Sequence, residues 1–279
     1  MAGQFRFWIV LLPLFWVHSA MAAWEEDGID VDVELVLAVD VSRSISPEEL
    51  IIQRVGYAEA LTSPEVLTAI REGFLGRIAV TYFEWAGEHM QRTVVDWTLI
   101  ETEADALAVA DMIRTNPAGT ASRTSVSGAL LYGAARFEGN GFNGTRRIID
   151  VSGDGPNNAG PPVLPVRDAV LEQGIIINGL PLLTNVGPGG FQRLEDLDLF
   201  FRDCVIGGPG AFLIAVTSWE QFAEAVRRKL VLEIAGLPMP APGRASGSGI
   251  VPAQFAASGH DCMIGERMWQ QRWNSPMSP

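Results

Sequence analysis

The sequence predicts an α/β domain with a doubly wound, mostly parallel six-stranded sheet and helices on both of its faces. The chain has 279 residues, of which 48% are hydrophobic, and this is enough to bury one large core. Segments with the pattern of strands alternate along the chain with segments that have the pattern of helices. Several of the strand segments are almost continuously apolar, which is typical of a sheet covered on both faces.

The N-terminal residues 1–22 have the pattern of a signal peptide. Arg6 supplies a positive charge, residues 7–17 are apolar, and Ala20-Met21-Ala22 is a small-x-small cleavage site. The apolar run is short for a membrane span, with an uncleaved anchor as the alternative. We therefore expect export to the periplasm or the extracellular space, and a mature chain without a transmembrane segment.

The first strand and its neighbours follow an acidic lead-in, residues 23–32. Glu34–Asp40 is an apolar run that ends in an acid, as a buried strand does. Ser46 has the pattern of a helix cap, and we expect a helix from there to about residue 61 and a short one from Ser63. Residues 77–84 and 93–97 predict a hairpin.

The second half of the chain continues the alternation to about residue 235, which sets the domain at residues 33–235. We expect strands over residues 147–151, 175–180 and 211–216, and helices over 103–114, 125–137, 163–172, 191–204 and 219–234. Residues 236–259 are rich in Gly, Pro, Ala and Ser and predict an irregular linker, followed by an irregular tail over 260–279. Cys204 and Cys262 predict a disulfide in an oxidising compartment, with two unpaired buried thiols as the alternative.

The formal net charge of −13 argues against nucleic-acid binding, since an acidic surface repels phosphate backbones. Acidic and hydroxyl side chains gather instead where two predicted strands end. Asp40, Ser42 and Ser44 follow the first strand, and Asp154 follows the strand at 147–151. The carboxyl ends of central parallel strands meet, and oxygen ligands of this kind suit Mg²⁺ or Mn²⁺. Helix capping by the same residues is the alternative.

Three segments together resemble the metal-ion-dependent adhesion site of von Willebrand A and integrin I domains. They are Asp40-x-Ser42-x-Ser44, Thr124 with Ala129-Leu130 five residues on, and Asp154-Gly155, in that order. The resemblance implies a von Willebrand A-like fold and a cation held by Asp40, Ser42, Ser44, Thr124 and Asp154, with a shell that an acidic ligand completes. Arg43 departs from the motif, which has a small residue there, and it either weakens the metal site or meets an acidic ligand.

A further resemblance is to bacterial exported proteins of this superfamily that are known as a domain of unknown function. It is carried by residues 150–158, Gly179-Leu-Pro181 and residues 205–212. This resemblance implies a fold and a site, but no activity.

The function that we expect is non-enzymatic, metal-dependent binding of a protein or other acidic ligand. A hydrolase with Asp150 or Glu84 as general base is one alternative, and a structural envelope protein with an unused site is another. Asp150, inside an apolar strand, is expected to support the metal loops or to pair with a structural partner. The expected rim of the site is formed by Arg43, Trp85, Arg123, Asn157 and Asn158.

The remaining motifs give weaker evidence for a ligand site. Gly139–Gly144 fits G-x-G-x-x-G but follows a helix and precedes a strand, the reverse of a dinucleotide site. Asp30, Asp32 and Glu34 alternate and so share one face, which makes a calcium site an alternative to a solvated acidic segment. His89 and His260 have no zinc-ligand motif nearby.

Overall fold

The computed structural model describes residues 28–116, 119–184, 194–236, 250–252 and 260–274. Its sheet has the strand order β3-β2-β1-β4-β5-β6-β7. All neighbouring strands are parallel except β3 and β7, which pair antiparallel at the two edges. The strands are β1 (Ile29–Asp40), β2 (Ile78–Trp85), β3 (Gln91–Ile100), β4 (Phe142–Gly153), β5 (Ile175–Pro181), β6 (Phe212–Ile214) and β7 (Ile250–Pro252).

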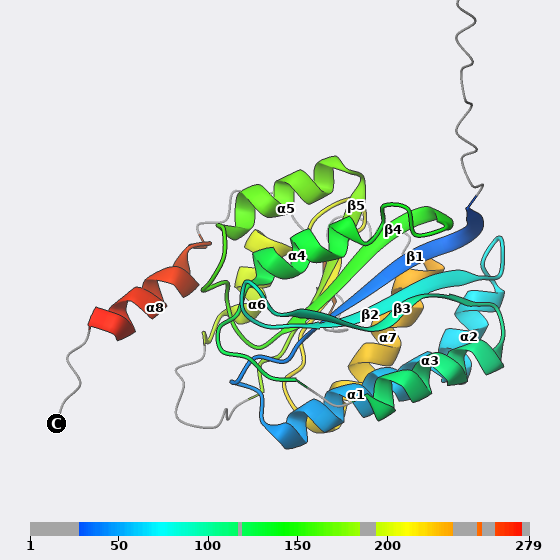
Figure 1. Ribbon diagram of the computed structural model, residues 1–279, viewed down its shortest axis with the longest axis horizontal. Coiled ribbons are helices and arrows are strands. Elements are labelled where there is room, and N and C mark those ends of the chain that lie inside the picture. Colours follow the sequence, from blue (N-terminus) through cyan, green and yellow to red (C-terminus); the bar gives the residue numbers. More distant parts are fainter. Residues whose placement is uncertain (1–27, 117–118, 185–193, 237–249, 253–259, 275–279) are drawn as a thin grey trace, which may run out of the picture.

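Helices cover both faces of the sheet (Figure 1). The layer of α1, α2, α3 and α7 packs on one face, and α4 and α5 pack on the other. The helices are α1 (Pro47–Leu61), α2 (Pro64–Arg71), α3 (Glu103–Thr115), α4 (Val126–Ala135), α5 (Val163–Glu172), α6 (Leu197–Phe200), α7 (Phe222–Ala235) and α8 (Ile264–Asn274). A π-helical turn, Phe201–Val205, continues α6, and a 3₁₀ turn, Trp219–Gln221, precedes α7. The predicted doubly wound fold is confirmed.

Strand β1 lies inside the sheet between β2 and β4, and its side chains alternate between two hydrophobic cores. Leu35 and Leu37 pack in the core under α1 and α7, whereas Val36 and Ala38 pack in the core under α4 and α5. This alternation is why the strand is apolar at nearly every position. It also decides which face of the sheet a polar residue at a given position will meet.

The loop after β1 is fixed where α1 begins. Ser46 accepts a hydrogen bond from the main-chain N–H of Glu49, and the Glu49 carboxylate accepts one from the main-chain N–H of Ser46. This capping box confirms Ser46 as the helix cap. It anchors the segment Val41–Ile45 between a buried strand and a capped helix, so the side chains in that segment have defined positions.

The structure differs from the sequence-based expectation at its ends. Strand β1 begins at Ile29, within the expected acidic lead-in, because Asp32 and Glu34 are satisfied by protein donors rather than by water. β7 and α8 lie in segments that we expected to be irregular. The signal peptide of residues 1–22 lies outside the described residues, as do residues 191–193 of the expected 191–204 helix. Within the described part of the chain, no helix is both long and apolar enough to cross a lipid bilayer.

Candidate metal centre

Three loops meet at the carboxyl end of the sheet, and they carry the predicted metal ligands that follow Asp40. Ser42 and Ser44 lie on the loop after β1, Thr124 lies just before α4, and Asp154 follows β4. The main-chain N–H of Arg43 donates to the carbonyl of Ala121 at 3.1 Å, which joins the first loop to the second. The structure therefore brings together segments that are distant in the sequence.

The hydroxyls of the two predicted serine ligands form a hydrogen-bonded chain that ends on a carboxylate. The Oγ atoms of Ser42 and Ser44 are 2.9 Å apart, and Ser44 Oγ donates to Oδ1 of Asp154 at 2.7 Å. These contacts place two neutral oxygens and one carboxylate within reach of a single ion, as an oxygen-ligated Mg²⁺ or Mn²⁺ requires.

Asp40 provides the test of whether these residues fit a cation. Its carboxylate is fully buried, and Oδ1 accepts a 2.7 Å hydrogen bond from the main-chain N–H of Ser42. Its Oδ2 atom is buried without a hydrogen-bond partner among the described residues. Burial, together with the charge of Asp154, raises the pKa of Asp40 well above its ordinary value. A divalent cation between the two carboxylates would remove both penalties, so the donor set fits the ion.

Gly153 allows Asp40 to approach the end of β4. A Cβ atom at Gly153 would lie 3.2 Å from Oδ2 of Asp40 and 3.4 Å from the Trp85 ring, which is tighter than ordinary contact. A larger residue here would push the unpartnered carboxylate oxygen out of its position.

Thr124 is positioned by Asn158 on the third loop. Its main-chain N–H donates to Oδ1 of Asn158 at 2.9 Å, and the main-chain N–H of Asn158 donates back to the Thr124 carbonyl at 2.8 Å. A Cβ atom at Gly155 would lie 3.6 Å from the Thr124 hydroxyl oxygen, so this hydroxyl lies beside the Asp154-Gly155 turn. Asn158 thus orients Thr124, one of the predicted metal ligands.

The expected rim residues divide into two groups. Arg43 and Arg123 are exposed, and both line a pocket of about 590 Å³ above the ligands. Trp85 is fully buried in the core under α4, so its assignment to the rim is wrong. Asn157 is also fully buried, and its Oδ1 accepts from the main-chain N–H and the hydroxyl of Ser127. Trp85 is the last residue of β2, and its ring packs in the core under α4 beside Gly153.

Asp150 and Glu84 are both paired with basic side chains. In the sheet register Asp150 lies beside Leu37, and Leu37 faces α1 and α7. Asp40 lies beside Trp85 of β2, which packs in the core on the opposite face of the sheet. Lys229 on α7 pairs with Asp150 at 2.6 Å. This is the structural alternative for Asp150, and it argues against a role in supporting the metal loops. Glu84 is fully buried and pairs with Arg54 and Arg92.

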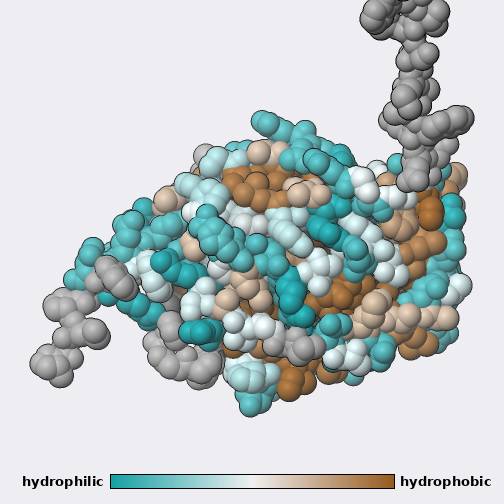
Figure 2. Space-filling model, viewed as in Figure 1, coloured by the Kyte–Doolittle hydropathy of each residue, from teal (hydrophilic) through white to brown (hydrophobic). Residues whose placement is uncertain are grey.

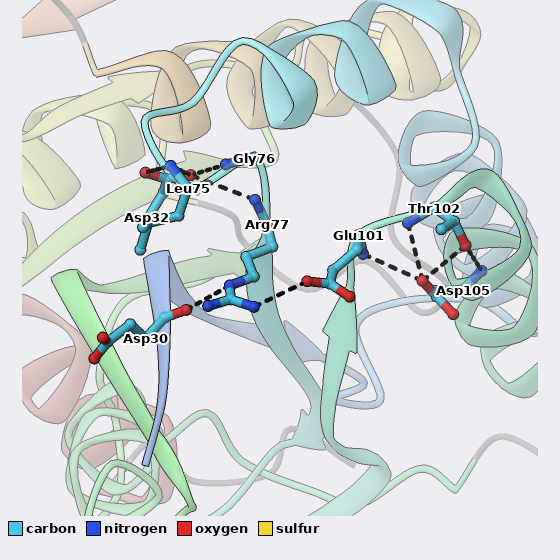
Figure 3. A network of polar contacts seen from close by, with 8 residues as sticks. All are labelled: Asp30, Asp32, Leu75, Gly76, Arg77, Glu101, Thr102 and Asp105. Carbon is cyan, nitrogen blue, oxygen red and sulfur yellow. Dashed lines mark hydrogen bonds and ion pairs between the residues drawn. The ribbon is translucent and has the colours of Figure 1, made fainter. Parts of the chain in front are cut away.

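The alternating acids at the start of β1 do not converge on a common site. Asp32 accepts hydrogen bonds from the main-chain N–H groups of Leu75 and Gly76, each at 2.9 Å. Figure 3 draws these bonds beside the one that Arg77 donates to the main-chain carbonyl of Asp30. Glu34 instead accepts a hydrogen bond from the main-chain N–H of Gly144. The calcium alternative is therefore wrong for the acids at 30, 32 and 34. In the described ranges no group of three or more His, Cys, Asp and Glu side chains is arranged to hold a metal ion. The centre described above contains only two such residues and relies on hydroxyls.

The disulfide between Cys204 and Cys262 is present, as predicted, and it ties the tail to the π-helical turn after α6. Cys204 is fully buried in the core under α4 and α5. The sequence did not predict that the tail forms α8 and contributes to the pocket. Two cysteines and a Trp-containing segment were the only signals in the sequence that the tail docks. The pocket residues from α8 are Gly265, Met268, Trp269, Gln271 and Arg272.

Comparison with solved structures shows the fold. Proximal thread matrix protein 1 (PTMP1) from the mussel byssus, in a structure with a zinc occupied MIDAS motif, aligns with a TM-score of 0.55 and 16% identity over 75% of this chain and 49% of that one. The pilus adhesin SpaC from Lactobacillus rhamnosus GG aligns with a TM-score of 0.54 and 11% identity over 73% of this chain and 31% of that one. The chain thus spans about half the length of PTMP1 and less of SpaC.

A third structure has nearly the same extent as the domain. An aerotolerance-related membrane protein from Bacteroides fragilis NCTC 9343 aligns with a TM-score of 0.50 and 17% identity over 71% of this chain and 98% of that one. The neighbours are von Willebrand A domain proteins, and the expected von Willebrand A-like fold is confirmed.

Comparison with curated proteins gives no match. Residues 30–238 match the family described as "Protein of unknown function (DUF1194)". This agrees with the resemblance carried by residues 150–158, 179–181 and 205–212. The chain therefore belongs to the family DUF1194, and its domain has the von Willebrand A-like fold.

Proposed function

We propose that this chain is an exported binding protein that engages a protein or other acidic ligand through a divalent cation. The cation, Mg²⁺ or Mn²⁺, is held by Asp40, Ser42, Ser44, Thr124 and Asp154. The observation that carries the proposal is the buried, unpartnered Oδ2 atom of Asp40, beside a second carboxylate and a chain of hydroxyls. Two neighbouring buried carboxylates without a cation are unfavourable, so the arrangement is best explained by the ion.

The ligand types favour a binding role for the ion. Three neutral hydroxyls and two carboxylates leave a divalent ion with little excess negative charge around it. Such an ion stays electrophilic and accepts a further oxygen ligand from a partner. The exposed Arg43 and Arg123 lie in the same pocket and suit an acidic partner. The zinc occupied MIDAS motif of PTMP1 and the adhesin SpaC support this role by analogy of fold.

A non-enzymatic role is part of the proposal. The two acids that the sequence offers as general bases are both engaged, Glu84 with two arginines and Asp150 with Lys229 on the other face of the sheet. A metal-dependent hydrolase needs a base beside the metal-bound water. A screen of ester, phosphoester and peptide substrates with Mg²⁺ or Mn²⁺ tests this point, and turnover that Asp40→Ala abolishes would overturn it.

The binding role is tested by crosslinking capture from the protein's own envelope fraction, with and without chelator. We expect partners that wild-type protein captures in Mg²⁺, and that are lost with chelator and with Asp40→Ala. The matched control is Asp111→Ala, which removes an exposed acid from α3 and should leave capture intact. Capture that is insensitive to chelator and to Asp40→Ala would favour a structural envelope protein with an unused site.

A further inference from the structure

Helix α8 lies beyond the carboxyl ends of the parallel strands, the end of the sheet that carries the metal loops (Figure 1). It supplies one wall of the pocket above the proposed ligands, with Trp269 and Arg272 among the lining residues. It also lies outside residues 30–238, the part of the chain that matches the family. The wall is thus supplied by a segment outside the part of the chain that matches the family.

Three kinds of contact hold α8 in this position. The disulfide from Cys262 to Cys204 ties the residues just before the helix to the domain. Glu266 accepts a 2.8 Å hydrogen bond from Nδ2 of the buried Asn157. Gly265 packs so closely on the same loop that a Cβ atom there would collide with the main-chain oxygen of Asn157. The helix therefore rests on the loop that follows Asp154, one of the proposed metal ligands.

Arg123 connects the wall to the metal centre. It is the residue before Thr124 and the one non-glycine residue with a positive φ, 79°, in the described part of the chain. Its guanidinium lies 3.8 Å from the centre of the Trp269 ring and donates to the Asn158 carbonyl at 2.9 Å. An arginine stacked on an aromatic ring keeps unused N–H donors in a fixed plane, which suits a carboxylate. Glu266, the acid of α8, contacts Asn157 and is not among the pocket-lining residues.

The charges that line the pocket are opposite in sign to the charge of the whole chain. The chain carries −13, yet the pocket lining contains Arg43, Arg123 and Arg272 against the single acid Asp154. A bound divalent cation would neutralise Asp40 and Asp154, which leaves the positive charges of Arg43 and Arg123 in excess. At about 590 Å³ the pocket has the size of a small-ligand site rather than that of a flat protein interface. Figure 2 shows polar residues over much of the surface around this end of the molecule.

We propose that α8 turns the metal face into a walled pocket for a ligand with two acidic groups, one on the cation and one on Arg123. Trp269 acts as a positioning residue for the Arg123 guanidinium. The proposal rests on the proposed function, since it needs the bound cation. Two sources share this chemistry: a small dicarboxylate, and two neighbouring acidic side chains on an extended peptide.

The test is calorimetric titration of mature protein in Mg²⁺ with acetate, succinate, glutarate and an Asp-rich hexapeptide. We expect a dicarboxylate or the peptide to bind at least tenfold more tightly than acetate, and the better of the two identifies the source. Arg123→Asn, which tolerates the positive φ, should remove most of this preference. Trp269→Ala should weaken it and Trp269→Phe should retain it, because Phe keeps an aromatic face for the guanidinium.

Two further variants separate the wall from the fold and from the metal. Gly265→Ala keeps every pocket side chain but displaces α8, and it should lower the preference while Mg²⁺ affinity stays within about twofold. Gln270→Ala, at an exposed position of α8 outside the pocket lining, should change nothing. Mg²⁺ binding without any preference for two acidic groups, or a preference that survives both Arg123→Asn and Gly265→Ala, would overturn this proposal alone. Absence of Mg²⁺ binding would overturn the proposed function as well.

Discussion

The hydroxyl of Ser44 donates a 2.7 Å hydrogen bond to Oδ1 of Asp154, and so joins the loop after β1 to the loop after β4. Both loops follow parallel strands inside the sheet, and the fold brings these distant segments together at the carboxyl ends of the strands. Asp40 is the last residue of β1, and the contact holds Asp154 against the loop that follows it. The spacing between the two carboxylates is therefore set by the sheet rather than by a flexible loop. The centre is therefore preorganised, and the repulsion between its carboxylates is present in the metal-free protein.

Asp154→Asn should raise the stability of metal-free protein while abolishing its stabilisation by Mg²⁺. Burial and the charge of Asp154 raise the pKa of Asp40. Removal of that charge should therefore raise the free energy of unfolding of the metal-free protein by about 1 kcal/mol. Asn keeps an oxygen acceptor for Ser44. Thermal melts with chelator and with excess Mg²⁺ measure both effects, with Asp111→Asn as the control. A metal-free variant that melts below the wild type would contradict the predicted repulsion.

Cys262→Ser should loosen the tail and lower stability. The disulfide closes a loop with a sequence separation of 58, for which the chain-entropy model gives about 4 kcal/mol as an upper value. Cys262 is only partly buried, so a serine hydroxyl there is better tolerated than at the fully buried Cys204. Urea unfolding and limited proteolysis of the tail are the measurements. Thiol titration of unreduced, denatured wild type should find no free thiol, and two per chain would contradict the bridge.

Stability should fall as pH rises from about 5 to about 7, in part through Glu233. Burial, and the charge of Asp150, raise the pKa of Glu233 from 4.5 to about 7. In this window the folded chain holds a proton that the unfolded chain has released, so the free energy of unfolding decreases with pH, by up to about 3 kcal/mol. Lys229 contacts both acids, and Asn178 donates to Glu233 at 2.9 Å.

Glu233→Gln isolates this contribution, because a Gln oxygen accepts the same hydrogen bonds but does not titrate. Urea unfolding at pH 5 and pH 8 should show a smaller loss of stability in the variant than in the wild type. The pKa of Asp150 is also raised by burial, so some pH dependence should remain. Equal losses in both proteins would contradict the assignment to Glu233.

Asp32→Ala should destabilise the domain without affecting metal binding. The Asp32 carboxylate accepts hydrogen bonds from main-chain N–H groups of the turn before β2, including Leu75 and Gly76 at 2.9 Å (Figure 3). Loss of these charge-assisted bonds should cost about 2–4 kcal/mol. Chemical denaturation and Mg²⁺ titration of one sample measure both properties. A loss of metal affinity at unchanged stability would contradict the structural role and point to a second ion site.

The sequence predicted the central features because they depend on local pattern and chain order. The apolar run up to Asp40 indicates a strand buried on both faces, and the capping pattern at Ser46 indicates the helix that follows. Parallel strands then bring their carboxyl ends together, which places Ser44 near Asp154 without further information.

Features that depend on strand register and on docking were not accessible to this reasoning. Asp150 faces α7 and Trp85 faces the core because of register between strands, which a single sequence does not specify. Beyond the predicted disulfide, the position of α8 depends on the close packing of Gly265 and on one hydrogen bond to Asn157. Such contacts leave no periodic signal in a short tail.

The most direct test of the metal centre is calorimetric titration of Mg²⁺ and Mn²⁺ into metal-free mature protein, with thermal melts of the same samples. Wild type should bind one ion and gain about 2.7 kcal/mol at a hundredfold excess over Kd. Asp40→Ala should stay folded and bind none, whereas Asp111→Ala should behave as wild type. Wild-type protein that gives no binding heat and no metal-dependent melting shift would contradict the proposed metal centre.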